Sequence, residues 1–223
     1  MSRTVLITGT SKGIGFALTK EFLKNGFNVI GTCRSGTDYN INEDNFQVSS
    51  LDLANFDSIY EFENSLRNKN ITLDILINNA GIGPDLDFNL PEQISFKQTF
   101  DVNVIGTTFF TEQMLKHIKK GGIIINMSSK MGSIDNCDLS DSVAYRMSKT
   151  ALNMYTKILT NRLMGQQIVA SVHPGWVRTS IAKSNIYGRL SPEESAKKIF
   201  DFVNSEFKSG IFWNVETQAE CKW

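Results

Sequence analysis

The sequence predicts an α/β protein in which a doubly wound sheet of seven parallel strands carries helices on both faces. Two observations support this fold class. Short runs of β-branched and apolar residues alternate along the chain with segments of helical periodicity. The first run also passes into its helix through a glycine-rich turn. No internal repeat or linker divides the chain, so residues 1–223 are expected to form one domain.

The predicted strands are short and apolar, as strands covered on both faces must be. The first, Thr4–Thr8, places three aliphatic residues between two threonines, and the fifth, Ile123–Met127, opens with consecutive isoleucines. The other strands are expected on the same grounds at Asn28–Thr32, Phe46–Ser50, Asp74–Asn78, Ile168–His173 and Gly210–Trp213.

The predicted helices combine helical periodicity with signals at their ends. An Asn-Gly pair follows Phe16–Leu23, and Ser95–Lys119 closes with lysine before a pair of glycines, which suits a helix C-terminus. Ser191 is placed to cap Pro192–Val203, which has proline first and glutamate third. The remaining helices are expected at Ser58–Arg67 and Ser142–Met164.

The composition argues against several functional classes. Lys plus Arg and Asp plus Glu each total 23, so no net charge attracts nucleic acid or an anionic membrane. The amino-terminal segment lacks a leader pattern and no apolar run is long enough to span a membrane, which predicts a cytoplasmic protein. The sequence predicts neither disulfides nor a metal site, because its cysteines are scattered and its histidines lack metal-ligand spacing: Cys33, Cys137, Cys221, His117 and His173.

The turn Thr8–Gly15 has the composition of a phosphate-binding loop. It lies between the first strand and the first helix, where backbone amides and the helix dipole bind a pyrophosphate and glycines let it approach. Its glycines are Gly9, Gly13 and Gly15, a Gly-x-x-x-Gly-x-Gly spacing rather than the commoner Gly-x-Gly-x-x-Gly. The alternative is an ordinary glycine-rich loop.

Two cations favour NADP(H) over NAD(H) as the cofactor. Arg34 follows the second strand, where an NAD-binding unit usually carries an acidic residue for the ribose 2′-hydroxyl. Arginine there suits a 2′-phosphate, and Lys12 adds a second cation from the phosphate loop. The alternative is that both are solvated surface charges.

Tyr145 and Lys149 have the spacing of an acid–base pair. On a helix, residues four apart lie on the same face, so the ammonium can approach the phenol. A cation about 4 Å away favours the phenolate and is expected to lower the pKa of Tyr145 from about 10 toward neutrality. The alternative is a surface pair without a chemical role.

Six motifs in order along the chain resemble the short-chain dehydrogenase/reductase family, which has a Rossmann-type fold. The segments Ser129–Ser133, Tyr145–Lys149 and His173–Thr179 further resemble the branch of sniffer-type carbonyl reductases and bacterial C-factor signalling proteins. The six motifs are the glycine loop, Asn78–Gly81, Asn103–Gly106, Met127–Ser129, Tyr145-x-x-x-Lys149 and Pro174-Gly175.

The resemblance implies a catalytic role for four residues. Tyr145 would be the general acid in carbonyl reduction, and Lys149 would hold the nicotinamide ribose and lower the Tyr145 pKa. Ser129, chosen over Ser128, would bind the substrate oxygen. Asn103, placed by an interruption of its helix, would join Lys149 to a proton relay through water.

The resemblance also implies which residues contact the cofactor. Asp52 would contact adenine, Asn79 would lie near the adenosine ribose, and Thr179 would contact the carboxamide. The full expected set is Gly9, Ser11, Lys12, Gly13, Ile14, Gly15, Arg34, Asp52, Leu53, Asn79, Ala80, Gly81, Tyr145, Lys149, Pro174, Gly175, Val177 and Thr179.

Few features of the sequence indicate which residues would contact the substrate. Met131 and Trp176 are expected to form an apolar wall, and Ser180–Leu190 is a short lid. Ser129 precedes Tyr145 by 16 residues, a longer interval than in many members of the family. The additional residues fall in Ile134–Asp141, which is expected to rim the pocket and contains Cys137, a thiol without a basic neighbour.

The sequence therefore predicts a cytoplasmic NADPH-dependent reductase of aldehydes or ketones. Its partners would be a small carbonyl or alcohol substrate and, through its two longest helices, a second copy of the chain, with no nucleic acid or membrane. The alternative is a signalling protein that binds NADP with little turnover. The related sugar-nucleotide epimerases are disfavoured by the glycine spacing and the short carboxyl end.

Overall fold

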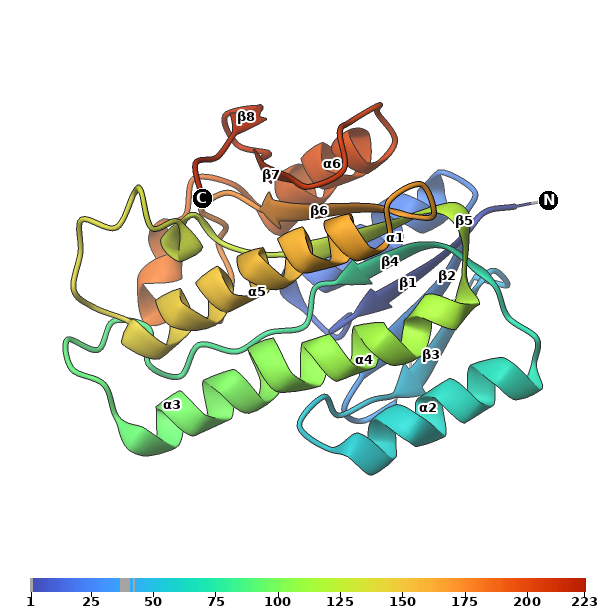
Figure 1. Ribbon diagram of the computed structural model, residues 1–223, viewed down its shortest axis with the longest axis horizontal. Coiled ribbons are helices and arrows are strands. Elements are labelled where there is room, and N and C mark those ends of the chain that lie inside the picture. The colour runs from blue at the N-terminus through green and yellow to red at the C-terminus, as the bar shows by residue number, and fades with distance from the viewer. Residues whose placement is uncertain (1, 37–40, 42) are drawn as a thin grey trace.

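The computed structural model describes residues 2–36, 41 and 43–223. Within them an eight-stranded sheet has the order β3-β2-β1-β4-β5-β6-β7-β8. Its first seven strands pair in parallel, and helices cover both faces of the sheet (Figure 1). The predicted α/β class is confirmed.

The strands match the predicted positions to within a residue or two, except at the start of β5. They are β1 (Thr4–Thr8), β2 (Asn28–Cys33), β3 (Phe46–Ser50), β4 (Leu73–Asn78), β5 (Ile118–Met127), β6 (Ile168–His173), β7 (Ile211–Asn214) and β8 (Ala219–Glu220).

The α-helices are α1 (Gly13–Lys24), α2 (Phe56–Asn68), α3 (Gln93–Phe100), α4 (Thr107–Met114), α5 (Val143–Arg162) and α6 (Pro192–Val203). Shorter helical turns are η1 (Asp101–Gly106), which is a π-helical turn, and the 3₁₀ turns η2 (Leu115–His117), η3 (Lys130–Gly132) and η4 (Lys183–Tyr187).

Successive side chains of the central strands pack on opposite faces of the sheet, because strand side chains alternate with a period of two. Val5 and Ile7 of β1 belong to the core beneath α1 and α6, whereas Leu6 belongs to the core beneath α2, α4 and α5. All three are fully buried. The consecutive apolar residues seen in the sequence therefore fill two separate cores.

The seven predicted parallel strands are confirmed, and the sheet has an eighth strand that the sequence did not predict. β8 is a two-residue strand that pairs antiparallel with Trp213 and Asn214 at the edge of the sheet. Both of its residues are exposed, and the turn before it places Gln218 at a φ of +52°. A short polar strand made by a turn leaves no apolar pattern in the sequence.

The prediction of one helix over Ser95–Lys119 is also wrong at its end. The helical run is α3, η1, α4 and η2 in succession, and β5 begins at Ile118 because this residue already pairs with Leu73 of β4. The expected interruption around Asn103 is present as η1. Here Gly106 lies so close to Leu53 that a Cβ would be 2.0 Å from the Leu53 carbonyl oxygen. The helical run therefore packs closely against the loop after β3.

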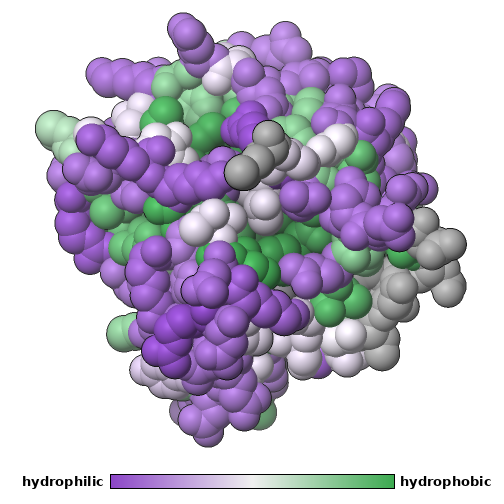
Figure 2. Space-filling model, turned by 90° about the vertical axis from the view of Figure 1, so that its right-hand side faces the viewer, coloured by the Kyte–Doolittle hydropathy of each residue, from purple (hydrophilic) through white to green (hydrophobic). Residues whose placement is uncertain are grey.

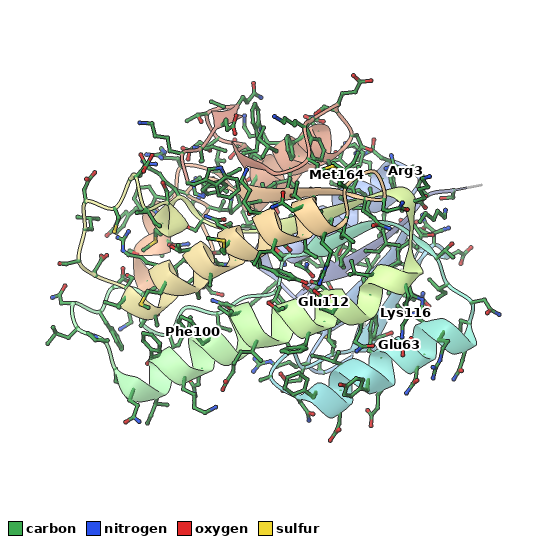
Figure 3. All side chains as sticks on the ribbon, viewed as in Figure 1. Arg3, Glu63, Phe100, Glu112, Lys116 and Met164 are labelled. Carbon is green, nitrogen blue, oxygen red and sulfur yellow. The ribbon has the colours of Figure 1, made fainter. Side chains whose placement is uncertain are left out.

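An ion cluster around the buried Glu63 joins α2 to η2. Glu63 lies 3.0 Å from both Lys116 Nζ and His117 Nε2, and Figure 3 shows Glu63 and Lys116 on facing elements. Burial alone would raise the pKa of Glu63, but hydrogen bonds from Lys116 and His117 outweigh it and hold the pKa below its usual value. The cluster holds α2 in place, and α2 does not line the cleft described below.

The strands run from right to left in Figure 1, so their carboxyl ends and the loops that follow them gather at the left. Figure 2 shows the opposite end, which is mostly hydrophilic with hydrophobic side chains in small areas. In sheets of this order, ligands bind outside the carboxyl ends of the strands. They bind near the switch point between β1 and β4, where the strand order reverses. Among the described residues, no helix is long and apolar enough to cross a membrane.

Candidate active site

A cleft of about 930 Å³ lies along the carboxyl ends of the strands. Of the predicted site residues only Asn103 and Lys149 lie behind its surface, with 1% and 4% exposure. The predicted residues that line it are Gly9, Ser11, Lys12, Gly13, Ile14, Gly15, Arg34, Asp52, Leu53, Asn79, Ala80, Gly81, Ser129, Met131, Tyr145, Pro174, Gly175, Trp176, Val177 and Thr179. Their contacts with a cofactor or substrate stay predictions.

The glycine loop is packed too tightly for side chains. A Cβ on Gly15 would lie 2.1 Å from the carbonyl oxygen of Gly9, and Gly9 has a φ of +73°. Asn79 fixes the loop, because its Nδ2 donates to the carbonyl oxygens of Thr8 at 2.8 Å and Gly9 at 3.2 Å. Asn79 therefore supports the loop as well as lining the cleft.

The amino end of α1 faces the cleft without an anionic partner of its own. Its N-cap, Lys12, makes no side-chain capping hydrogen bond, and the first turn holds no acidic residue. Unpaired amides and the positive end of the helix dipole favour an anion at this place. The cradle fits a pyrophosphate, as the sequence predicts.

Arg34 and Lys12 border the same end of the cleft, and both are exposed. Within the described residues the guanidinium of Arg34 makes no ion pair. Asp52, which follows the neighbouring strand β3, instead accepts a hydrogen bond from the amide of Ala54 at 3.0 Å. The two cations are thus available to a bound phosphate.

Ser129 and Tyr145 meet in the other half of the cleft. Ser129 follows β5, and its hydroxyl lies near enough to the phenol of Tyr145 in α5 to act on the pKa of that phenol. Ser129 Oγ also accepts from the amide of Met131 at 3.1 Å. Ser128 turns away into the core, where its Oγ donates to Asn153 Oδ1 at 2.6 Å. This geometry favours Ser129 over Ser128 as the residue that faces a substrate.

The expectation that Lys149 lowers the pKa of Tyr145 is wrong for this structure. Lys149 Nζ donates to the carbonyl oxygen of Met127 at 2.7 Å and lies 5.6 Å from the centre of the Tyr145 ring. Burial raises the pKa of Tyr145 to about 12; the nearby Ser129 hydroxyl opposes the rise, and the charge of Asp85 adds to it. Burial also lowers the pKa of Lys149 to about 8.

Asn103 is held by the π-helical turn beside this pair. Its Nδ2 donates to the carbonyl oxygen of Ile82 at 2.7 Å and to Ser148 Oγ at 3.1 Å, and its Oδ1 accepts from the Ile82 amide at 2.9 Å. A Cβ on Gly81 would lie within 3.4 Å of both Asn103 Oδ1 and Lys149 Nζ. The structure therefore brings Asn103 and Lys149 together behind Gly81.

Sequence reasoning missed part of the cleft wall. The loop after β4 contributes Ile82, Gly83 and Leu86, which no motif marked. His173 was expected only to pack, but it lines the cleft at the end of β6, where burial lowers its pKa to about 4. Its position directly before Pro174-Gly175 is the one signal that placed it near the site.

A sequence profile described as short chain dehydrogenase matches residues 3–188. This match covers most of the chain, including every predicted catalytic residue. The chain belongs to the short-chain dehydrogenase family.

Curated relatives of this short-chain dehydrogenase include human retinol dehydrogenase 13, at 32% identity over 89% of the chain and 66% of the relative. Another is 3-amino-tetrahydro-pyrrolizinone reductase of Xenorhabdus hominickii, at 34% identity over 80% of the chain and 63% of the relative. The chain thus spans slightly less than two-thirds of the length of these relatives.

Solved structures of similar length also match. The carbonyl reductase Sniffer of D. melanogaster has a TM-score of 0.88 at 27% identity, with all of both chains covered. An NADPH-bound carbonyl reductase from chicken fatty liver has a TM-score of 0.85 at 27% identity, covering 100% of this chain and 99% of that one. An NADP-bound short-chain dehydrogenase/reductase from Burkholderia multivorans gives 0.87 at 25%, again with full coverage of both.

The lengthened loop of this short-chain dehydrogenase does not rim the cleft, contrary to expectation. Residues 134–141, Cys137 included, contribute nothing to its lining. The amide of Asp135 donates to the carbonyl oxygen of Trp223 at 3.1 Å, and the carboxylate of Asp141 forms an ion pair with Arg146. The lid Ser180–Leu190 does line the cleft, in part, and carries η4.

Proposed function

We propose that the protein is an NADPH-dependent oxidoreductase that reduces the carbonyl group of an aldehyde or ketone and oxidises the alcohol in reverse. The observation that carries the proposal is the pair of hydroxyls, Ser129 and Tyr145, that lie close together and line one half of the cleft. The other half is the anion cradle at the amino end of α1. A proton donor and a dinucleotide cradle in one cleft suit hydride transfer to a carbonyl carbon.

The residues of the cradle would hold the cofactor, which supplies the hydride when bound. The glycine loop and α1 would receive the pyrophosphate, and Arg34 with Lys12 the 2′-phosphate. The NADP and NADPH bound to similar structures support this choice of cofactor.

The chain's own residues would manage the proton. Tyr145 donates its phenolic proton to the carbonyl oxygen, and the Ser129 hydroxyl hydrogen-bonds the same oxygen as negative charge develops there. Lys149, protonated and buried beside Asn103, supplies positive charge behind the phenol. Fixed donors and charges in a cleft of low polarity lower the barrier more than they would in water.

The substrate's other groups would be apolar. Around the reacting hydroxyls the wall is built from Ile82, Leu86, Met131, Trp176 and Ile181. Absorbance at the NADPH band, followed for the purified protein with a panel of aromatic and aliphatic aldehydes and ketones, tests the proposal. Turnover of none of them at any NADPH concentration would contradict it.

A homodimer is a further part of the proposal. The outer faces of η1, α4 and α5 expose large apolar side chains: Ile105, Phe109, Met154 and Ile158. Apolar faces of this kind suit a partner with the same surface.

The pH dependence of reduction should report Lys149. Tyr145, with a pKa of about 12, keeps its proton across the neutral range, whereas Lys149 loses its charge as the pH rises through about 8. We therefore expect kcat for reduction to be level below about pH 8 and to fall above it. The measurement is kcat at saturating NADPH and carbonyl substrate as a function of pH.

The variant Lys149→Arg separates Lys149 from other groups in this profile. Arginine stays charged at every accessible pH, so the alkaline decline should disappear in whatever activity remains. A decline that stays at the same pH in the variant would assign it to another group.

Arg34→Ala should reduce the preference for NADPH over NADH. A charge-assisted hydrogen bond to phosphate contributes about 1.5–3 kcal/mol, so the ratio of kcat/KM values should fall by about 10- to 100-fold, through loss of NADPH use. The control is Lys24→Ala, which removes an exposed cation from the far end of α1. An unchanged ratio in Arg34→Ala would contradict the role given to Arg34.

A further inference from the structure

The helix that carries Tyr145 has no cap of its own. Its N-cap residue, Ser142, has a φ of +55° and makes no side-chain hydrogen bond to the first turn. The amides of the first turn need acceptors from elsewhere, because no preceding helical carbonyl reaches them. Catalytic geometry depends on this end of α5, since Tyr145 is the third residue of the helix.

Asp85 supplies the missing acceptor from a different part of the chain. Its Oδ2 accepts hydrogen bonds from the amides of Ala144 at 2.8 Å and Tyr145 at 3.2 Å. These are the second and third residues of α5, the two positions that an N-cap side chain serves. Asp85 is 1% exposed and lies in the loop after β4, 60 residues before Tyr145.

Other residues of this loop also contact the amino end of α5. The carbonyl oxygen of Phe88 accepts from the Ser142 amide at 2.8 Å, and the Asp87 amide donates to Ser142 Oγ at 3.3 Å. Gly83 lies against the phenol itself, since a Cβ there would be 2.9 Å from Tyr145 Cδ2. The loop thus contacts both the backbone and the ring of Tyr145.

We infer that Asp85 is the positioning residue for Tyr145. It caps the amino end of α5 from a distant part of the same chain, the loop after β4. The inference rests on the proposed function for its catalytic consequence. It also accounts for the long interval between Ser129 and Tyr145. The start of α5 is set by residues 83–88, so the loop over 134–141 can change in length without moving the phenol.

The carboxylate of Asp85 also acts on the phenol through its charge. Among the described residues, the ionisable and hydroxyl groups that act on Tyr145 or lie over its ring are Asp85 from the loop after β4, Ser129 from the end of β5 and Lys149 from α5. The charge of Asp85 raises the pKa of Tyr145. Asp85→Asn keeps an acceptor for the two amides and removes the charge, whereas Asp85→Ala removes both, so the pair separates positioning from electrostatics.

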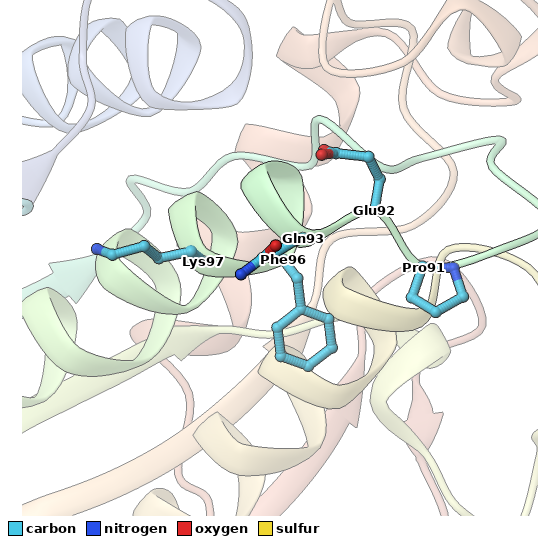
Figure 4. A pocket seen from close by; sticks show the side chains of 5 residues that line it. All are labelled: Pro91, Glu92, Gln93, Phe96 and Lys97. Carbon is cyan, nitrogen blue, oxygen red and sulfur yellow. The ribbon is translucent and has the colours of Figure 1, made fainter.

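Glu92 provides a matched control. It caps α3 in the same way, with its carboxylate oxygens accepting from the amides of Ile94 at 2.9 Å and Ser95 at 2.7 Å. It lies in a shallow groove of its own with Pro91 and Phe96, outside the cleft (Figure 4). Glu92→Ala therefore removes a helix cap of the same type without touching the site.

The experiment combines two readouts on the full chain. The first is kcat and KM for NADPH-dependent carbonyl reduction, and the second is hydrogen exchange at the amides of Ala144 and Tyr145. For Asp85→Ala we expect kcat to fall at least tenfold with the KM for NADPH within threefold, and exchange at both amides to accelerate. Asp85→Asn should keep kcat within threefold and retain protection of both amides. Glu92→Ala should match the wild type at the site.

Several results would overturn the inference. Wild-type protection of both amides in Asp85→Ala would show that Asp85 does not cap α5, and this readout does not depend on any activity. A loss in Asp85→Asn as large as in Asp85→Ala would assign the effect to charge instead of position. If Asp85→Ala does not fold, Asp85→Asn still decides the inference: kcat should stay within threefold and both amides should stay protected. A wild-type protein without reductase activity would defeat the proposed function while leaving the exchange result to judge the cap.

Discussion

Tyr145→Phe should lower kcat for carbonyl reduction by about 10³-fold while leaving the affinity for NADPH nearly unchanged. General acid–base catalysis contributes about 10²- to 10⁴-fold, and phenylalanine removes the only proton that the Tyr145 ring can give. The Ser129 hydroxyl still lines the cleft in this variant, so the substrate oxygen would keep one donor of two. The ring itself still fills its place against Gly83, so the cleft should keep its shape.

The measurements are single-turnover reduction at saturating NADPH and a fluorescence titration of NADPH binding. Tyr155→Phe is the control, because Tyr155 lies on the same helix but donates to Glu112 Oε1 at 2.7 Å, away from the cleft. It should cost about 1 kcal/mol of stability through the lost hydrogen bond and leave kcat within about threefold. Turnover by Tyr145→Phe at the wild-type rate would remove the basis for the enzymatic proposal.

The strands and helices along the chain could be predicted because the two kinds of element differ in their local sequence patterns. β1 has three consecutive aliphatic residues, as does the second half of β5, and α6 begins with a full capping box at Ser191, so both kinds of element can be recognised over a few residues. β8 and the start of β5 could not be anticipated. Pairing of Ile118 with Leu73, and of β8 with the edge of the sheet, is decided by tertiary contact and not by local pattern.

The candidate site likewise contains residues that the sequence marked and residues that it did not. Residue type and spacing marked Tyr145, Lys149 and the glycine loop, since each needs its particular chemistry at a particular place. They gave no signal for Asp85, because an acidic residue in a loop looks like a solvated charge until the fold buries it against α5. They also misjudged the Tyr145 pKa, which depends on burial and on the direction in which Lys149 Nζ points.

Gly15→Ala should weaken NADPH binding by at least about 100-fold, because it destroys the cradle on which the cofactor assignment rests. The backbone at this residue would accept alanine, and alanine in a helix is favoured over glycine by about 1 kcal/mol. The added Cβ, however, would lie 2.1 Å from the Gly9 carbonyl oxygen and 2.5 Å from Asn79 Nδ2. Neither neighbour can retreat easily, since Asn79 is hydrogen-bonded to that same oxygen. The loop must therefore open away from the helix amides.

The measurements are the NADPH dissociation constant and the midpoint of thermal unfolding. Gly26→Ala separates binding from stability: Gly26 has a φ of +78° with nothing within 4 Å of an added Cβ. It should cost about 1–2 kcal/mol of stability through backbone strain alone and leave the dissociation constant unchanged. If Gly15→Ala loses binding no more than Gly26→Ala does, the tight approach of Gly15 to Gly9 has no part in holding the cofactor. The pyrophosphate would then have to bind elsewhere than at the amino end of α1.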